Sequence, residues 1–252
     1  MNKKAKLIKV LKDQVLYSLS STAALSDKFI DGLDWPGDKA TLVFKFPEKE
    51  AGRGLPVPDS VSRKKYVCRL VYMAEKSEIP AAPADGAACG LELAGFKNAA
   101  EHRKWALATD LKYFSRPFRA YLTPGFKAEA GEYYRKELPR AKGVCVRRKG
   151  KIVSMLTLLK IAGKAGAGPL DWVSWIWVDP RLPGVERRCI HALLRGWLRE
   201  NGRGRIGASV HAANIKSQKW FLRSGFRPAR LCFTRRALKP VGKQNKGNGG
   251  AS

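Results

Sequence analysis

The segment Asp171-Trp-Val-Ser-Trp-Ile-Trp-Val-Asp-Pro180, with the turn Pro183-Gly184 and the helical run that follows, decides the fold. Trp172 to Val178 is almost wholly apolar and rich in β-branched and aromatic residues, which is typical of a strand covered on both faces. Apolar residues then recur at helical spacing at Ile190, Leu193, Leu194, Trp197 and Leu198. Asn201-Gly202 ends this run, as glycine does just past a helix C-terminus. The segment therefore predicts a buried strand, a turn and an amphipathic helix.

The residues downstream continue the same alternation of strand and helix. Ile206 to Val210 predicts a second short strand, and Asn214 opens a helix whose Trp220 and Phe221 face inward. Gly225-Phe226 closes that helix. A loop that rises from a buried strand into a helix N-terminus presents free backbone N–H groups, and such groups bind phosphate.

These motifs resemble those of the GNAT superfamily of acyl-CoA N-acyltransferases. The resemblance rests on Val178-Asp-Pro180, the turn and helix after it, and Asn214-x-x-Ser217-x-x-Trp220-Phe221-x-x-x-Gly225-Phe226. It covers residues 144 to 234 and implies an α/β (α+β) fold, a mixed sheet flanked by helices. It also implies an N-acyltransferase with acetyl-CoA as donor and a primary amine as acceptor.

The resemblance assigns the cofactor contacts to two segments of this chain. They comprise Trp177, Val178, Gly184, Val185, Glu186, Arg187, Arg188, Cys189, Ile190, Asn214, Ser217 and Phe221. In the family the strand ending in V-x-P splays away from its neighbour, and its backbone pairs with the pantetheine arm. The turn after it wraps the pyrophosphate, and the backbone N–H at Val178 is expected to polarise the acyl carbonyl.

Two departures from the family pattern concern this site directly. The family's pyrophosphate turn reads R/Q-x-x-G-x-G/A, whereas Gly184-Val-Glu-Arg-Arg-Cys-Ile190 holds a single glycine. Arg187 and Arg188 either compensate with side-chain charge, since arginine grips phosphate bidentately, or are solvated residues of a helix start. Phe221 stands where the family often carries the tyrosine that protonates the leaving thiolate, and phenylalanine has no hydroxyl.

The candidates for a catalytic base are few. Asp179 ends the central strand, Asp171 begins it, Glu186 lies in the turn and His211 ends the following strand. We name Asp179 and Asp171 as catalytic candidates, although each has a structural alternative, shaping the turn or pairing with an arginine. An amine that loses its proton through water needs no side-chain base.

The charge of the chain points to polyanionic partners. Net charge is +28 with a pI of about 10.3. From Gly131 onward the chain contains 27 Lys and Arg but only 6 Asp and Glu. A basic surface of this kind attracts nucleic acid, anionic lipid or acidic cofactors. The alternative function is therefore a GNAT-like fold with a degenerate CoA site that binds nucleic acid. A nucleic-acid or ribosome contact is also compatible with the enzyme.

Cysteine usage and hydropathy indicate the compartment. Five scattered cysteines, with no metal-binding spacing, suggest free thiols in a reducing cytoplasm and no metal site; they are Cys68, Cys89, Cys145, Cys189 and Cys232. No apolar run reaches the ~18 to 20 residues that a membrane span requires.

We expect residues 1–95 to form an N-terminal region that matches no family, residues 96–240 to form the acyltransferase-like domain, and residues 241–252 to be a disordered tail. The lysines spaced along Met1 to Ser21 predict an amphipathic helix, docked on the protein itself, on a membrane or on nucleic acid. Segments 39–46 and 65–74 predict strands that pair as a hairpin, and the Ala- and Pro-rich segment 77–90 predicts a linker.

The middle of the chain predicts helices over 99–113 and 128–138, then strands over 144–146 and 152–161 joined by a tight turn, and residues 231–234 predict the last strand. The aromatic residues between 114 and 126 either pack in the core around a helical hairpin or stack nucleic-acid bases. Residues 163–169 predict a flexible loop.

Overall fold

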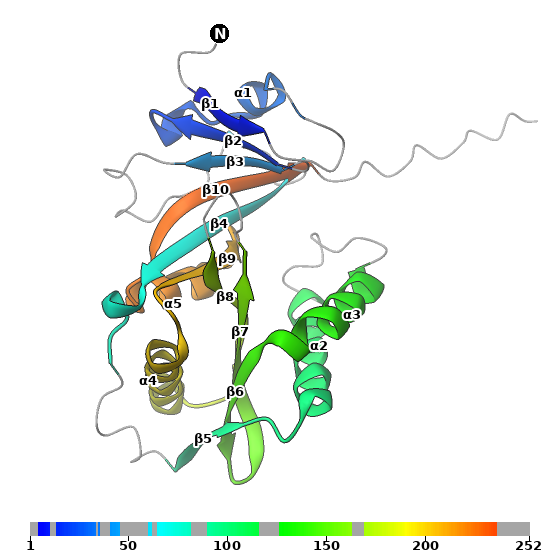
Figure 1. Ribbon diagram of the computed structural model, residues 1–252, viewed down its shortest axis with the longest axis vertical. Helices are drawn as coiled ribbons and strands as arrows, with labels where there is room; N and C mark the ends of the chain where they lie inside the picture. Colours follow the sequence, from blue (N-terminus) through cyan, green and yellow to red (C-terminus); the bar gives the residue numbers. More distant parts are fainter. Residues whose placement is uncertain are drawn as a thin grey trace, which may run out of the picture.

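Figure 1 shows a computed structural model of the chain, which describes residues 5–10, 14–33, 35, 41–45, 60–61, 65–81, 90–115, 126–162 and 169–235. Ten strands form one mixed sheet in the order β1-β2-β3-β10-β4-β9-β8-β7-β6-β5. In chain order the strands are β1 (Ala5–Val10), β2 (Gln14–Leu19), β3 (Thr41–Lys45), β4 (Tyr66–Glu75), β5 (Leu91–Gly95), β6 (Lys142–Arg148), β7 (Lys151–Ile161), β8 (Leu170–Val178), β9 (Arg205–His211) and β10 (Arg227–Arg235). The predicted class, a mixed sheet flanked by helices, is confirmed.

Helices cover both faces of the sheet (Figure 1). The longer ones are α2 (Ala99–Ser115), α3 (Phe126–Glu137), α4 (Gly184–Asn201) and α5 (Ile215–Arg223), and the short ones are α1 (Asp27–Asp31), η1 (Thr22–Ala24), η2 (Lys76–Glu78) and η5 (Leu138–Arg140). Apolar residues of α4 and α5 join the main core with β4, β7 and β9, whereas α2 and α3 pack on the opposite face around Met155. The helices predicted over 99–113 and 128–138, after Pro183-Gly184 and from Asn214 are all present.

The β6–β7 hairpin follows directly from its turn residues. Lys149 and Gly150 have φ angles of 49° and 75°, the left-handed pair that a two-residue hairpin turn needs. β7 pairs antiparallel with β8, and β8 pairs parallel with β9 across the α4 crossover. The predicted order of strand, turn and helix around β8 is confirmed.

The predicted N-terminal helix is wrong. Residues 5–10 and 14–19 form the antiparallel strands β1 and β2, and β2 pairs parallel with β3. Val15, Leu16, Tyr17 and Leu19 are buried in this arrangement. A helix would bury only one stripe of this run, whereas a strand inside the sheet can bury side chains on both faces.

The predicted pairing of the segments 39–46 and 65–74 is also wrong, although both segments are strands. β10 lies between β3 and β4 and pairs antiparallel with each of them, and β4 pairs in turn with β9. Strands that precede residue 96 therefore share one sheet with strands from the C-terminal part. The division into domains at residues 95/96 stays a prediction, but no separate N-terminal sheet exists among the described residues.

The predicted linker over 77–90 is partly structural. Ile79 is fully buried, and its carbonyl accepts a hydrogen bond of 2.8 Å from Arg199 Nη1 on α4. Residues 82–89 lie outside the described residues, as do the aromatic segment 116–125, most of the predicted loop 163–168 and the predicted tail.

Candidate active site

The central feature of the site is the point at which β8 and β9 separate. The two strands pair only from Asp171↔Ile206 to Val173↔Ala208. A register shift in the β7–β8 ladder at Thr157/Leu158 leaves Ser174 as the extra residue of β8, where the separation begins. Residues 170–173 are buried but residues 174–178 are only half-buried. The expected strand covered on both faces is therefore found in its first half only, because β9 departs.

The separation leaves backbone groups of β8 without a strand partner. The Asp179 N–H donates to Val153 O at 2.9 Å, and Ser154 Oγ donates to Trp177 O at 2.6 Å, so these groups face β7. Successive residues of a strand direct their N–H groups to opposite sides. The N–H groups of Ile176 and Val178 consequently point into the gap that β9 has left. The role that the resemblance assigns to the Val178 N–H, to polarise an acyl carbonyl, stays a prediction.

The N-terminus of α4 begins directly beyond that gap. Pro183 is its N-cap residue and makes no side-chain capping bond, while Gly184, Val185, Arg187 and Arg188 are exposed. The first N–H groups of the helix thus have no intrahelical acceptor. Of the residues predicted to bind cofactor here, the side chain of Ile190 is fully buried in the core and does not face a ligand.

Glu186, in the same turn, forms an ion pair with Arg148. Its Oε1 lies 3.0 Å from Arg148 Nη2, at the end of β6, and only 19% of its side chain is exposed. The pair neutralises the one acidic side chain in the first turn of α4. An anion that approaches this turn therefore meets little repulsion from Glu186.

A cationic cluster lies between α4 and α5. Burial, and then the charges of Arg195, Arg187 and Arg223, lower the pKa of His191 to about 4, so this imidazole is neutral near pH 7. Among the described residues none of these three arginines is in an ion pair. The sequence prediction missed Arg195 and Arg223. The i, i+4, i+8 spacing of Arg187, His191 and Arg195 places these three on one face of α4. No such pattern points to Arg223, at the end of α5.

At the N-terminus of α5, Asn214 and Ser217 bond to each other, a contact that the sequence did not predict. Asn214 Oδ1 accepts from the Ser217 N–H at 3.1 Å, and Asn214 Nδ2 donates to Ser217 Oγ at 2.7 Å. Trp220 and Phe221 are buried, as predicted. Asn214 is therefore the N-cap of α5, a role it fills without any ligand.

Phe221 has a tyrosine as its stacking partner. Its ring lies 5.7 Å from that of Tyr72 on β4, with 19° between the planes. Tyr72 pairs with Ala208, in the last row before the strands separate, and its hydroxyl donates to Gln218 Oε1 at 3.4 Å. Burial raises the pKa of Tyr72 to about 12, so the hydroxyl keeps its proton. No motif in the sequence linked Tyr72 to this site.

The two catalytic candidates lie at opposite ends of β8. At about 3.3 Å per residue, the eight steps along the chain from Asp171 to Asp179 span roughly 26 Å. Asp179 lies at the separated end, where the Arg181 guanidinium donates to both its oxygens at 3.0 and 2.7 Å. Asp171 lies at the paired end and accepts from the Arg203 N–H at 2.7 Å. The structure therefore does not bring the two carboxylates into one site.

A third carboxyl group lies in the wall formed by α2 and α3. Asp110 is 7% exposed and accepts a hydrogen bond of 3.1 Å from the Tyr134 hydroxyl. Burial raises the pKa of Asp110 to about 6. The neighbouring Thr109 Oγ1 accepts from Trp175 Nε1 at 2.8 Å, which attaches this wall to the separated half of β8.

The signal that the sequence prediction missed is the polar inner face of α2. His102, Ala106, Thr109 and Asp110 are buried, whereas Trp105 and Leu107 are half-buried. His102 Nε2 lies 2.7 Å from Thr157 Oγ1 of β7, and burial lowers the pKa of His102 to about 4. The helix therefore attaches to the sheet through a neutral polar contact, which an apolar pattern does not reveal.

The expectation of free thiols throughout is wrong at Cys189. Cys68, Cys145 and Cys232 are buried and form no disulfide, but Cys189, in the second turn of α4, is disulfide-bonded. Spacing along the sequence does not show which thiols meet in space. This bond removes the argument from free cysteines for a reducing compartment. No helix among the described residues has the length and apolarity to cross a bilayer.

No family model and no curated protein matches this sequence. Solved structures with a loosely similar arrangement include a GCN5-related N-acetyltransferase from Sphaerobacter thermophilus, at 16% identity and TM-score 0.46, over 94% of this chain and 76% of that one. A putative acetyltransferase of the GNAT family from Novosphingobium aromaticivorans has 16% identity and TM-score 0.42, over 79% and 74%. A functionally unknown conserved protein from Staphylococcus epidermidis has 11% identity and TM-score 0.45, over 79% and 73%. Similarity at this level carries no argument about activity.

Proposed function

We propose that this chain is an acyl-CoA-dependent N-acyltransferase, with acetyl-CoA as the donor and a primary amine as the acceptor. The observation that carries the proposal is the separation of β8 from β9 after Val173/Ala208, directly before the uncapped N-terminus of α4. An extended polar chain such as a pantetheine arm can pair with the N–H groups that β8 leaves free. The phosphates then lie at the helix N-terminus.

In this proposal the α4–α5 cluster replaces the missing glycines. A glycine-rich turn binds pyrophosphate through its backbone, whereas arginine side chains bind it through charge-assisted, bidentate hydrogen bonds. Arg187 and Arg188 are exposed at the start of α4, and Arg195 and Arg223 lie with Arg187 close enough to His191 to lower its pKa. Ser217 and Asn214 complete the cofactor contacts at α5.

The chemical roles follow from charge and position. The Val178 N–H stabilises the negative charge that develops on the acyl oxygen. Tyr72, whose ring stacks on Phe221 and whose hydroxyl is protonated, is our candidate to protonate the leaving thiolate. Asp110 is our candidate base, because its pKa near 6 is close to the working pH of a general base. Asp179 must leave its ion pair with Arg181 before it can accept a proton.

Thermal unfolding of nucleic-acid-free protein with acetyl-CoA, free CoA and ATP tests the proposal. A ligand at 100 times its Kd stabilises the folded state by about 2.7 kcal/mol. We expect both CoA compounds to raise Tm more than ATP at equal concentration, and amine-dependent release of CoA thiol from acetyl-CoA. Equal shifts for all three anions would show that only the basic surface is being titrated.

Two variants separate a phosphate site from general charge. Arg187→Gln is expected to weaken acetyl-CoA binding about tenfold, the effect of losing one charge-assisted contact. Lys104→Gln removes the same charge from the exposed surface of α2, on the other face of the sheet, and is expected to leave binding unchanged. Equal losses in the two variants would contradict a site at α4.

A further inference from the structure

A second cationic feature lies at the other end of the central strands. A cavity of about 230 Å³ opens between the start of β6, the end of β7, the start of β8 and the C-terminal end of α4. Its lining includes Lys142, Lys160, Asp171, Asn201 and Arg203. Since Asp171 lies roughly 26 Å along β8 from Asp179, the cavity is remote from the proposed acyl-transfer site.

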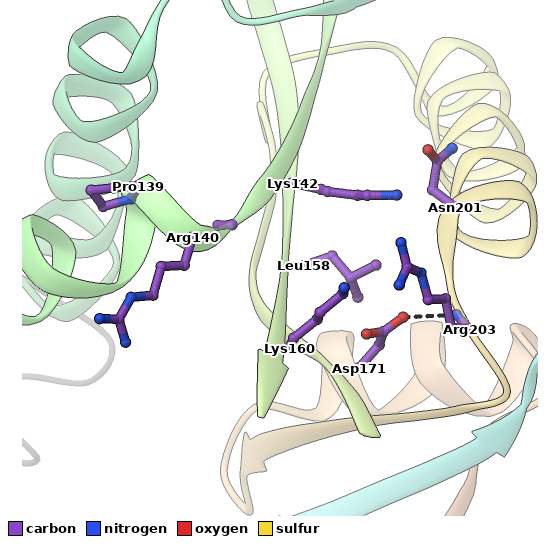
Figure 2. A pocket seen from close by; sticks show the side chains of 9 residues that line it. Pro139, Arg140, Lys142, Leu158, Lys160, Asp171, Asn201 and Arg203 are labelled. Carbon is purple, nitrogen blue, oxygen red and sulfur yellow. Dashed lines mark hydrogen bonds between the residues drawn. The ribbon is translucent and has the colours of Figure 1, made fainter. Parts of the chain in front are cut away.

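The polar side chains converge on this cavity. Figure 2 shows Lys142, Lys160 and Arg203 pointing into the same space from β6, β7 and the α4–β9 connection, with the amide of Asn201 above them. Arg140, which also belongs to the lining, points away from the centre (Figure 2). Three cations from three separate segments are thus held together by the fold.

The charge of the cavity is not balanced from within. Among the described residues the side chains of Lys142, Lys160 and Arg203 form no ion pair and no hydrogen bond to a protein group. The single carboxylate, Asp171, accepts from the backbone N–H of Arg203 at 2.7 Å. Three positive charges less one negative charge leave a net charge of +2.

The C-terminus of α4 does not explain these cations. Basic side chains often satisfy the last carbonyls of a helix. Here Gly202 N donates to Leu198 O at 2.9 Å, Asn201 Nδ2 to Trp197 O at 3.0 Å and Lys76 Nζ to Glu200 O at 3.3 Å. None of these donors belongs to the three side chains that face the cavity.

We propose that this cavity binds the terminal phosphate of a small phosphate monoester. Near neutral pH a monoester carries between −1.5 and −2 charges, which matches the net charge of the cavity. A diester of a nucleic-acid backbone carries a single charge per phosphate and leaves the site unbalanced. Arg203 supplies a bidentate donor, the two lysines supply point charges, and the Asn201 amide supplies a neutral donor.

Calorimetric titration of the full chain with glycerol phosphate tests the proposal, with dimethyl phosphate as the diester probe. We expect the monoester to bind at least tenfold more tightly than the diester. Lys160→Gln and Arg203→Gln should each weaken monoester binding about tenfold, the effect of one charge-assisted hydrogen bond. Arg203→Gln keeps the backbone N–H that Asp171 requires.

Two further variants give the test its controls. Lys151→Gln removes a lysine from the opposite end of β7 and should leave monoester binding unchanged. Asp171→Asn keeps an oxygen acceptor for the Arg203 N–H but removes the negative charge, so it should tighten binding severalfold. Thermal unfolding of each variant confirms that it is folded.

Three results would overturn the proposal. One is equal affinity for monoester and diester, and another is an equal loss in Lys160→Gln and Lys151→Gln. The third is binding of a single-stranded oligonucleotide that Lys160→Gln weakens, together with no detectable binding of glycerol phosphate. Because the cavity is remote from β8's separated end, acetyl-CoA binding should persist in Lys160→Gln whether or not the phosphate proposal holds.

Discussion

Gly225 occupies a backbone position that only glycine adopts without strain. Its φ is +84°, and a Cβ atom there would lie 2.3 Å from the carbonyl oxygen of Glu78. Gly225→Ala should therefore lower the free energy of unfolding by about 2 kcal/mol or more, measured by denaturant titration. Gly225 lets the end of α5 lie against the backbone of η2. The glycine of the Asn214–Phe226 motif therefore serves packing.

Gly131 is the matched control for that substitution. It lies within α3, and a Cβ atom added there meets nothing within 4 Å. Gly131→Ala should raise the free energy of unfolding by roughly 0.5 to 1 kcal/mol, because alanine favours the helix. A destabilisation of similar size at both positions would contradict this explanation.

Asp110 gives a prediction in which stability and activity change in opposite directions. Its pKa rises from 3.8 to about 6 on folding, so the native state favours the protonated form. Its contribution to stability is complete below pH 3.8 and is lost as pH rises through about 6. Asp110→Asn, which still accepts from Tyr134, should therefore raise the free energy of unfolding at pH 7.5 by about 3 kcal/mol.

The same substitution should lower kcat by about 100-fold if Asp110 is the base. At pH 3 the difference in stability between Asp110→Asn and the parent should nearly vanish, since the parent carboxyl is then largely protonated in both the folded and the unfolded state. Equal stabilisation at both pH values would show that charge is not the cause. Unchanged kcat would limit Asp110 to a structural role.

At the scale of elements, substitutions of Asn214 and Ser217 distinguish the contribution of the α5 helix cap from that of a side-chain hydrogen bond. Asn214→Ala removes both the bond to the Ser217 N–H and the bond to Ser217 Oγ, whereas Ser217→Ala removes only the second. We expect Asn214→Ala to cost about 1 kcal/mol of stability and Ser217→Ala a few tenths. Thermal unfolding of both variants checks this, and equal costs would show that the cap is unimportant.

At the scale of the whole molecule, β4 and β10 connect the two parts of the chain. β10 pairs with β3 on one side and β4 on the other, and β4 also pairs with β9. A fragment of residues 90–252 leaves β10 with neither neighbour and exposes its apolar side chains, such as Phe233. We expect this fragment to show no cooperative unfolding transition by circular dichroism.

A longer fragment provides the comparison. Residues 60–252 retain β4, so β10 keeps one partner and β9 keeps its second neighbour. This fragment should unfold cooperatively, at a lower Tm than the full chain. Cooperative unfolding of residues 90–252 with a Tm close to that of the full chain would contradict the structural role of β4 and support the predicted boundary at residues 95/96.

The sequence by itself determined the elements whose signals are local. The apolar run before Asp179-Pro180, the helical stripe from Ile190 to Leu198 and the Asn214 cap were all predicted, because each depends on residues a few positions apart. The β6–β7 hairpin belongs to the same group.

Only the tertiary structure decided what depends on distant segments. Residues 5–19 form strands because β3 supplies an edge for pairing. β10 lies between β3 and β4, although more than 150 residues of chain separate it from them. The separation of β8 from β9, the distance between Asp171 and Asp179, and the stacking of Tyr72 on Phe221 arise in the same way. Side-chain periodicity reports which faces are apolar, but hydrogen-bonded pairing between remote strands sets which faces meet.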